Sequence, residues 1–542
     1  MNKDAYKKIY EYHQVTKHHF NRYAASAGSM DWENQPNPFR FYEKAPIVEM
    51  PLLESDLNID HRGLYFCENN TQDFSLISLG GFLELSLGLS AWKSFQGSQW
   101  CLRMNPSSGN LHPTEAHLIV PQLKDMEAGV YHYNPFLHAL EQRAELPGAL
   151  SSDIEQFFNS KGFLISLTSI YWRQSWKYGE RAFRYCNHDV GYALAAIRFS
   201  ANLFGWKVNY LNSLSDLSLD SILGFNKLQW SKLDKEEPDL LCWVFPKDAT
   251  NVNMGLSDSI IENLKNINFQ GKPNKLSKSD YCWEIIYESS DCIKKPKVAA
   301  QDYIYEKAFD NSLFSSDIKA GQLIRKRRSA QAYISEKSFI ALDVFLAILE
   351  KTLPYSDRAS FDLGLNEICI NLAIFVHRVR ELEEGLYFFI RNKKHFQDLK
   401  ASFKSDFLWE QVRDNLPLYR LKKSKVTQQA ADISCMQDIA GDSAFSLGMI
   451  ALFDPIIRDE PYKYKNLFWE SGAIGQVLYL EAESHGLRGT GIGCYFDDVM
   501  HELLGLKSSK YQSLYHFTIG SPLEDERLTT LPPYFHLKDI RK

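Results

Sequence analysis

The sequence predicts an α+β protein in which two copies of one domain pack together as an intrachain pseudo-dimer. The 542 residues are too many for one ordinary core, so two or three domains are expected. Helix and strand signals alternate without the regular βαβ order of a parallel sheet. A pattern of strand, glycine and long helix also occurs twice along the chain, which indicates an internal repeat.

The composition excludes several classes of protein. Hydrophobic residues make up 44% and aromatic residues 13% of the chain, which is enough for large cores. The net charge is -6 and the Lys and Arg residues are spread out, so no nucleic-acid partner is expected. Neither a membrane span nor a secretory signal is expected, because long apolar runs are absent. The nine cysteines form no C-x-x-C pair, which favours reduced thiols, a cytoplasmic protein and no metal site.

The N-terminal 255 residues contain an arm and a first domain. Residues 1–55 are expected to form a short helix and then an extended arm, because Pro36 and Pro38 exclude a helix there. Residues 56–255 have the signals of an α+β domain. The expected elements are helices over 74–92 and 179–204, strands at 115–120, 163–167 and 240–245, and a strand–turn–strand junction at 129–133.

A polar, proline-punctuated stretch over 256–315 is expected to be a linker. The pattern then restarts in 316–542, the second predicted domain. The stretches that repeat are 129–133 with 385–389, 183–205 with 464–486, and 219–224 with 500–505. Two copies of one domain in one chain predict the pseudo-dimer.

A turn cluster over 103–113 comes directly before an expected strand. Its proline fixes φ, its glycine permits positive φ, and its small polar side chains bond the nearby backbone. Taken alone, it is either a plain connection or a loop that turns N–H groups and hydroxyls toward an oxygen-rich ligand. The candidate binding residues are Arg103, Pro106, Ser107, Ser108, Gly109 and Asn110.

The Arg-x-x-Pro-Ser-x-Gly order of this loop, followed by a strand and by Gly129–Tyr133, resembles the SagB-type dehydrogenases. These form a branch of the FMN-dependent nitroreductase-like superfamily. The resemblance covers nearly the whole chain. It implies two nitroreductase-like domains, each with an antiparallel or mixed sheet flanked by helices, and FMN bound at their interface by residues of both.

The second copy begins with a basic stretch that resembles the family's FMN-phosphate signature, Arg-x-Ser-x-Arg/Lys. The matching residues are Arg327, Arg328, Ser329 and Gln331. Guanidinium groups match a phosphate bidentately, and a nearby hydroxyl adds a bond. Gln331 departs from the Lys or Arg of many members, which lowers the positive charge. The alternative interpretation is a solvated basic helix end.

The two copies differ in complementary ways. The first keeps only Arg62 where the second has its basic stretch. The second has 361–366, which includes Asp362, where the first has its Pro-Ser-Ser loop. We therefore expect one composite FMN site between the copies, with a degenerate symmetry-related counterpart.

A glycine-rich stretch after the second long helix resembles the family's loop beside the flavin ring. Gly491, Ile492 and Gly493 lie in it, and small residues allow the ring to approach the main chain. Arg527, beyond the next expected strand, is a further candidate for binding the phosphate. The alternative for Arg527 is a surface residue.

Lys177 and Tyr178 resemble the Lys-Tyr pair of azoline-oxidising members, in which a base takes a proton while hydride passes to FMN. Partial desolvation lowers the pKa of a lysine, and a tyrosine relays or donates a proton. The alternative is an exposed lysine beside a packed tyrosine.

The resemblance implies an FMN-dependent oxidoreductase that transfers hydride between an organic substrate and FMN. The substrate is a small molecule or a peptide, and oxygen or NAD(P)H is the redox partner. Two alternatives stay open, namely an NAD(P)H-dependent nitro or quinone reductase and a flavin-binding or structural pseudo-enzyme. The tandem arrangement is compatible with a monomer or a dimer.

Overall fold

A computed structural model describes residues 3–231, 233–303, 305–306, 316–365 and 367–541. Residues 304 and 307–315 of the expected linker lie outside the described residues, as does Asn366 of the 361–366 stretch. The same holds for residues 1–2 of the expected arm, for Lys232 and for Lys542.

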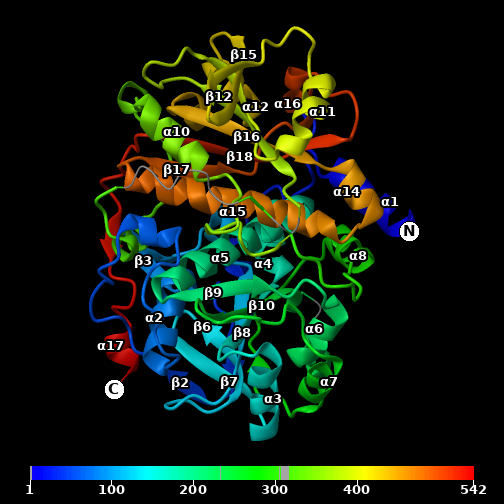
Figure 1. The fold of residues 1–542 in the computed structure, drawn as a ribbon, viewed down its shortest axis with the longest axis vertical. Helices are drawn as coiled ribbons and strands as arrows, with labels where there is room; N and C mark the ends of the chain where they lie inside the picture. Colours follow the sequence, from blue (N-terminus) through cyan, green and yellow to red (C-terminus); the bar gives the residue numbers. More distant parts are fainter. Residues whose placement is uncertain (1–2, 232, 304, 307–315, 366, 542) are drawn as a thin grey trace.

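Two seven-stranded sheets form two lobes, with a pair of long helices between them (Figure 1). The strand orders are β2-β7-β6-β5-β8-β10-β9 and β14-β15-β13-β12-β16-β18-β17. The last five strands have the same relative chain order in both sheets, and their neighbours pair antiparallel. The α+β class is confirmed, and two sheets of this kind are consistent with two domains.

The first lobe contains the elements expected over 56–255, with two differences. One is that residues 129–133, expected as a strand–turn–strand junction, lie within a single continuous strand. Its strands are β2 Ile47–Glu49, β5 Thr114–Val120, β6 Gly129–Asn134, β7 Ala139–Glu145, β8 Phe163–Ser169, β9 Trp206–Tyr210 and β10 Glu237–Pro246. Its helices include α2 Leu76–Leu87, α3 Gly148–Phe158, α4 Tyr171–Tyr178, α5 Ala182–Leu203 and α6 Asp216–Ile222. The expected helix 74–92 was too long, because the chain leaves the helix at Gly88 and continues as a strand, β3 Leu89–Phe95.

The second lobe repeats much of this arrangement. Its strands are β12 Ile370–Val376, β13 Gly385–Phe389, β14 Glu410–Arg413, β15 Leu416–Lys423, β16 Phe445–Leu452, β17 Arg488–Ile492 and β18 Tyr511–Gly520. Its helices include α9 Ala320–Lys326, α10 Leu342–Glu350, α11 Phe396–Ser402, α12 Thr427–Ile433, α13 Asp438–Gly441, α14 Asp454–Asp459, α15 Lys463–Ser484 and α16 Asp497–Leu504. Gly385 begins β13 as Gly129 begins β6. Gly224 and Gly505 follow α6 and α16 with φ of 69° and 84°, in the left-handed region that favours glycine.

Helices α5 and α15 form the contact between the lobes, and every residue of α5 is buried. Two glycines allow their backbones to approach closely. A Cβ at Gly191 would clash with the carbonyl of Trp469, and a Cβ at Gly472 would clash with the carbonyl of His188. Side chains larger than hydrogen are therefore excluded where the two helices touch.

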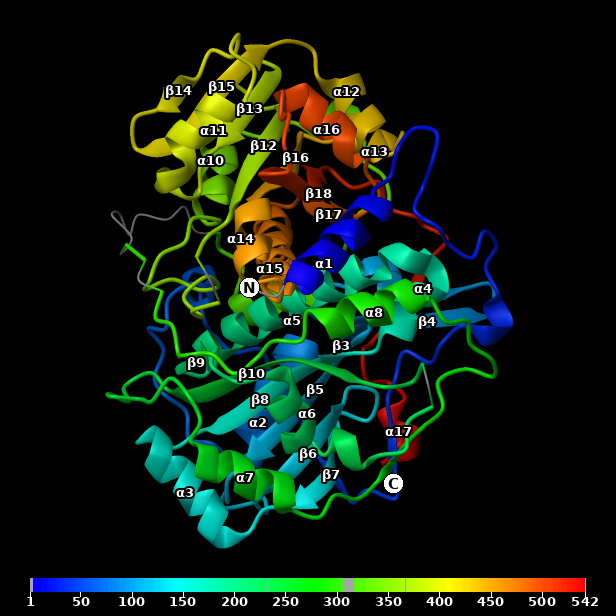
Figure 2. The same ribbon diagram turned by 90° about the vertical axis from the view of Figure 1, so that its right-hand side faces the viewer.

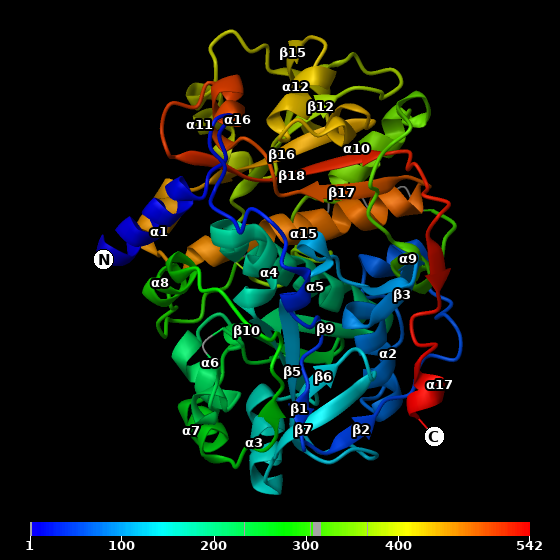
Figure 3. The same cartoon turned by 180° about the vertical axis from the view of Figure 1, so that it is seen from behind.

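Both ends of the chain cross between the lobes (Figures 2 and 3). Helix α1 Lys3–Val15 reaches the second lobe, where the Tyr6 hydroxyl donates to Asp454 Oδ1 at 2.6 Å. At the other end, β19 Thr529–Leu531 pairs with β3 of the first lobe. The last helix, α17 Leu537–Ile540, also lies against the first lobe. The C-terminal segment is thus held by the lobe that the N-terminal half of the chain forms.

The described part of 256–315 is more structured than a plain linker. It contains α7 Asp258–Asn266, α8 Glu284–Cys292 and the short strand β11 Lys272–Pro273, which pairs with β1 Tyr42–Glu43 of the arm. Among the residues that the structure describes, no helix has the length and apolar character needed to cross a membrane.

The close approach of α5 and α15 predicts that Gly191→Val strongly destabilises the protein. The valine side chain has no space beside the Trp469 carbonyl, so the helices must separate. We expect the free energy of unfolding to fall by about 3 kcal/mol or more, measured by urea denaturation. Gly148→Ala is the matched control, because a Cβ at Gly148 meets no atom within 4 Å. Equal midpoints for both variants would contradict this account of the helix contact.

Candidate functional site

A cavity of about 590 Å³ lies between the two lobes and is lined by residues of both. Most of the residues singled out in the sequence line it. These are Arg103, Pro106, Ser107, Ser108, Gly109, Asn110, Tyr178, Arg327, Arg328, Ser329, Gln331, Gly491, Ile492 and Gly493. Lys177 and Arg527 are not part of its wall.

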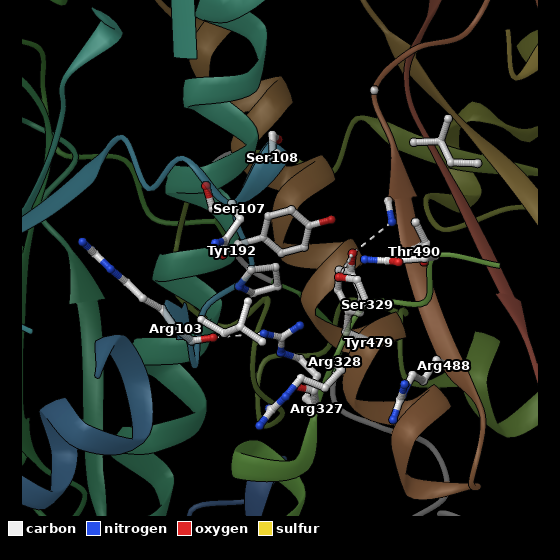
Figure 4. A pocket seen from close by; sticks show the side chains of 18 of the residues that line it. Arg103, Ser107, Ser108, Tyr192, Arg327, Arg328, Ser329, Tyr479, Arg488 and Thr490 are labelled. Atoms are coloured by element: carbon white, nitrogen blue, oxygen red, sulfur yellow. Dashed lines mark hydrogen bonds between the residues drawn. The ribbon is translucent and has the colours of Figure 1, made fainter. Parts of the chain in front are cut away.

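Two adjacent arginines after α9 give the cavity a positive end (Figure 4). Arg327 is 4% exposed, and its guanidinium donates to the carbonyls of Met104 and Arg103 at 3.2 and 3.0 Å. Arg328 donates to three carbonyls, among them that of Ser90 at 3.2 Å. In the described part of the chain, neither guanidinium has a carboxylate within ion-pair distance. Burial lowers the pKa of Arg327 and lowers that of Arg328 to about 10, where the neighbouring Arg327 charge also contributes.

Two further cations line the cavity and differ in their partners. Lys93 Nζ donates to Thr530 Oγ1 at 2.7 Å, and burial lowers its pKa. Arg488 forms an ion pair with Glu524 at 2.6 Å. Within the described residues, the uncompensated positive charge therefore lies with Arg327, Arg328 and Lys93, which is the electrostatic pattern of an anion site.

Arg103 points away from the cavity, although its backbone lines it (Figure 4). Its guanidinium donates to the carbonyls of Thr114 and Pro38 at 3.3 and 2.6 Å. Its own carbonyl accepts from Arg327. The side chain thus fixes the start of the loop, and its position does not fit the direct contact with a ligand that the sequence predicted.

The Pro-Ser-Ser loop is anchored by a carboxylate that sequence reasoning missed. Asp189 of α5 accepts the Ser107 hydroxyl at 2.7 Å, the Ser108 N–H and hydroxyl at 3.0 Å each, and the Gln174 amide at 2.9 Å. Both hydroxyls therefore donate within the protein, which favours a plain connection over a ligand-facing loop for these two groups. Burial raises the pKa of Asp189 to about 7, against the lowering effect of these hydrogen bonds.

Tyrosines form the centre of the cavity wall. They are Tyr178, Tyr185, Tyr192, Tyr479 and Tyr515. The hydroxyls of Tyr192 and Tyr515 are 2.9 Å apart, so residues of the two lobes meet directly there. The Tyr178 and Tyr185 ring centroids are 4.5 Å apart. Burial raises the pKa of Tyr178, Tyr185, Tyr192 and Tyr515, which keeps these hydroxyls protonated.

Tyr479 joins the basic stretch to the glycine-rich strand. Its hydroxyl accepts from Ser329 Oγ and from the N–H of Gly491, both at 3.0 Å (Figure 4). A Cβ at Gly491 would clash with the Tyr515 hydroxyl, and a Cβ at Gly493 would clash with the Tyr185 ring. Glycine is required at both positions because tyrosine side chains approach the main chain there. The sequence alone did not show this.

Lys177 and Tyr178 end α4, and only Tyr178 reaches the cavity. Successive helical side chains point about 100° apart, so the two residues face different surroundings. The Lys177 ammonium lies 5.4 Å from the Tyr178 ring centroid, and partial burial lowers its pKa. The Tyr178 hydroxyl lies beside Gly109 and has no hydrogen-bond partner among the described residues. Of this predicted pair, the structure places Tyr178 at the cavity.

Arg527 lies outside the cavity. Its side chain is exposed and forms an ion pair with Asp525 at 2.7 Å, two residues earlier. Asp525 and Leu528 line the cavity on either side of it. The alternative given by the sequence, a surface arginine, matches this position.

The residues of the site that were not predicted have only a weak signal in the sequence. Asp189 and Tyr192 lie one turn apart on α5 and flank Gly191, at which the helix meets α15. An acidic residue inside a long helix of the core requires a partner, and this rule points to Asp189. The partner itself is distant in the chain. Within the described ranges, no group of three or more His, Cys, Asp or Glu could hold a metal ion.

Three comparisons place the fold among known proteins. Residues 324–521 match the model of the Nitroreductase family. A protein described as nitroreductase MJ1384 of Methanocaldococcus jannaschii is 26% identical over 122 residues, which are 22% of this chain and 62% of that protein's length. The match thus spans less than two thirds of this relative.

Solved structures extend the similarity to the whole chain. A structure of a protein named as a nitroreductase from Anabaena variabilis covers 95% of this chain and 99% of its own, with 21% identity and a TM-score of 0.67. The microcin synthetase McbBCD complex of E. coli aligns over 41% of this chain and 79% of its own, with 15% identity and a TM-score of 0.28, too low to support a conclusion. The first similarity shows the fold. Residues 324–521 thus resemble the Nitroreductase family, whose members are oxidoreductases that are generally FMN-dependent.

Proposed function

We propose that this protein is a SagB-type, FMN-dependent oxidoreductase that transfers hydride between an organic substrate and one FMN bound between two copies of one domain. The observation that carries the proposal is the pair Arg327 and Arg328. Both lie at one end of a cavity lined by both lobes, and neither has a carboxylate partner in the described part of the chain. Two such cations favour a doubly charged phosphate group.

The residues present fit a flavin mononucleotide. The cavity of about 590 Å³ lies in the range of about 300–1,000 Å³ that is usual for ligands of this size. Arg327, Arg328 and Ser329 would hold the phosphate. The loop 106–110 and residues 491–493 both line the remaining space and would hold the ring.

One site per chain follows from how the proposed copies differ. Counted from the matched glycines Gly205 and Gly486, Tyr210 stands where the second copy has Gly491. The Tyr210 N–H donates to the carbonyl of Leu363 at 3.2 Å, so this position is filled by the protein. Next to it, Asp362 forms an ion pair with Arg198 at 2.6 Å. Among the described residues, these two contacts argue against a second flavin site at the counterpart position.

The protein's own residues supply orientation and a proton donor. When bound, FMN would supply a two-electron hydride acceptor or donor. Tyr178 is assigned as proton donor because its hydroxyl faces the cavity without a described partner, and burial raises its pKa well above the ordinary value. Asp189 acts as a positioning residue by fixing Ser107 and Ser108 opposite the glycine strand. The substrate enters the same cavity, and we assign the direction of transfer from substrate to FMN. Tyr178 serves the second half-reaction, in which it would donate a proton to the acceptor that takes up the electrons.

Arg327→Ala is expected to weaken FMN binding by about 10- to 100-fold, because a charge-assisted hydrogen bond contributes about 1.5–3 kcal/mol. The dissociation constant is measured by quenching of FMN fluorescence on titration with flavin-free protein. Arg527→Ala is the matched control, since that side chain is exposed and paired with Asp525. Unchanged affinity in Arg327→Ala, or a larger loss in Arg527→Ala, would overturn the assigned phosphate site.

Tyr178→Phe is expected to slow protonation of the product by about 100-fold, the lower end of the usual contribution of a general acid. The measurement is stopped-flow oxidation of the dithionite-reduced, FMN-loaded protein by 1,4-benzoquinone. Lys177→Met tests the neighbouring residue and is expected to leave the rate close to that of the unmodified protein. A slower rate for Lys177→Met than for Tyr178→Phe would instead assign the proton transfer to the lysine.

A further inference from the structure

Two cysteines meet at the edge of the cavity. Cys494 follows Gly493 and lines the cavity, whereas Cys435 lies in the turn between α12 and α13. Two hydrogen bonds hold the turn against the strand, from Gln437 Nε2 to the Cys494 carbonyl at 3.1 Å and from the Phe496 N–H to the Ile433 carbonyl at 2.8 Å. The two thiols are partly exposed, and the proximity of each shifts the pKa of the other. This contact brings together residues 59 positions apart in the chain.

The backbone of the turn is unusual. Cys435 and Met436 have φ of 55° and 59°, in the left-handed region that non-glycine residues rarely adopt. Strained positions of this kind persist where the surrounding structure requires them, and they concentrate at functional sites. Here the strained conformation lies in the turn that contains Cys435.

The arm supplies a hydrogen-bond donor to Cys494. His18 hydrogen-bonds to the Cys494 thiol, and its Nδ1 accepts the N–H of Ala24 at 3.0 Å. Because Nδ1 is an acceptor, the neutral ring carries its proton on Nε2 and can donate to sulfur. Arg181 adds positive charge nearby, with Nη2 donating to the Gly493 carbonyl at 3.1 Å. Together they favour the thiolate of Cys494.

The pKa values agree with this arrangement. The hydrogen bond from Cys435 is the largest of the effects that lower the pKa of Cys494 to about 5, and the same contact raises the pKa of Cys435. Cys494 is therefore the thiol that loses its proton first. Burial has the opposite effect on five other cysteines, whose pKa values are raised, namely Cys67, Cys101, Cys186, Cys242 and Cys292.

We propose that Cys494 and Cys435 form a dithiol site that reduces low-molecular-mass disulfides which enter through the cavity. The Cys494 thiolate attacks one sulfur of the disulfide R–S–S–R, forms a mixed disulfide and releases the first RS⁻. Cys435 then gives up its proton and attacks the Cys494 sulfur, forming the intrachain disulfide and releasing the second RS⁻. With two protons taken up by the thiolates, one dithiol and one R–S–S–R give one protein disulfide and two R–SH.

The roles of the two cysteines follow from their positions. Cys494 has the lower pKa and lines the cavity, so it is the attacking thiol. Cys435 already lies within hydrogen-bond reach of it, and a disulfide needs only the shorter S–S separation of about 2.05 Å. The product would tie the α12–α13 turn to the cavity wall. This inference does not depend on the identity of the cofactor.

The test is to incubate the full-length protein as purified with glutathione disulfide, then alkylate the remaining thiols with N-ethylmaleimide under denaturing conditions, so that the buried cysteines also react, and measure masses. We expect the number of free thiols to fall from nine to seven and a Cys435–Cys494 cross-link in the peptide map. Cys435→Ser should stop at one glutathione on Cys494, and Cys494→Ser should form no cross-link. Cys67→Ser is the matched control and should react as the unmodified protein does.

Nine free thiols after incubation, or a cross-link between other cysteines, would overturn the proposal. A second measurement is the pH dependence of Cys494 alkylation by iodoacetamide, followed by peptide mass. The midpoint is expected well below the ordinary thiol value of about 8.5 and should rise in His18→Ala. A midpoint at the ordinary value in the unmodified protein would remove Cys494 as the attacking thiol.

Discussion

The close contact of α5 with α15 is the constraint on which the rest of the structure depends. Gly191 and Gly472 let each helix backbone meet a carbonyl of the other helix, so the distance and rotation of the lobes are fixed at one place. From this contact, α5 directs Tyr192 into the cavity and α15 directs Tyr479. A wall made of residues far apart in the chain is thereby held to a single geometry. The geometry of the polar cavity therefore depends on the close helix packing beside it.

The two lobes contribute different properties to the site. The first lobe contributes a loop whose polar groups are satisfied by Asp189, and so it offers shape and the Tyr178 hydroxyl. The second lobe contributes charge, because Arg327 and Arg328 donate their hydrogen bonds to carbonyls and keep their positive charge available. Carbonyls orient a guanidinium without neutralising it. An anion bound here would neutralise the charges of these two guanidinium groups.

Sequence patterns predicted the elements and a part of the cavity wall, because hydrophobic periodicity and glycine positions are local signals. The helix at 464–486 and the basic stretch at 327–331 are examples. The direction in which a side chain points was harder to predict. The Arg103 side chain, for example, turns away from the cavity toward Pro38. Partners across the chain were not predictable at all. Asp189 meets Ser107 and β19 joins the first lobe through contacts that no local pattern encodes.

The central claim is one composite flavin site per chain, and the most direct measurement is the stoichiometry of FMN binding. Flavin-free protein is titrated with FMN under tight-binding conditions and the equivalence point is read from the fluorescence or calorimetric curve. The account predicts one FMN per chain, because Tyr210 and the Arg198–Asp362 pair fill the counterpart position. Two FMN per chain would show that the counterpart also binds. No binding at all would contradict the assignment of a flavin site.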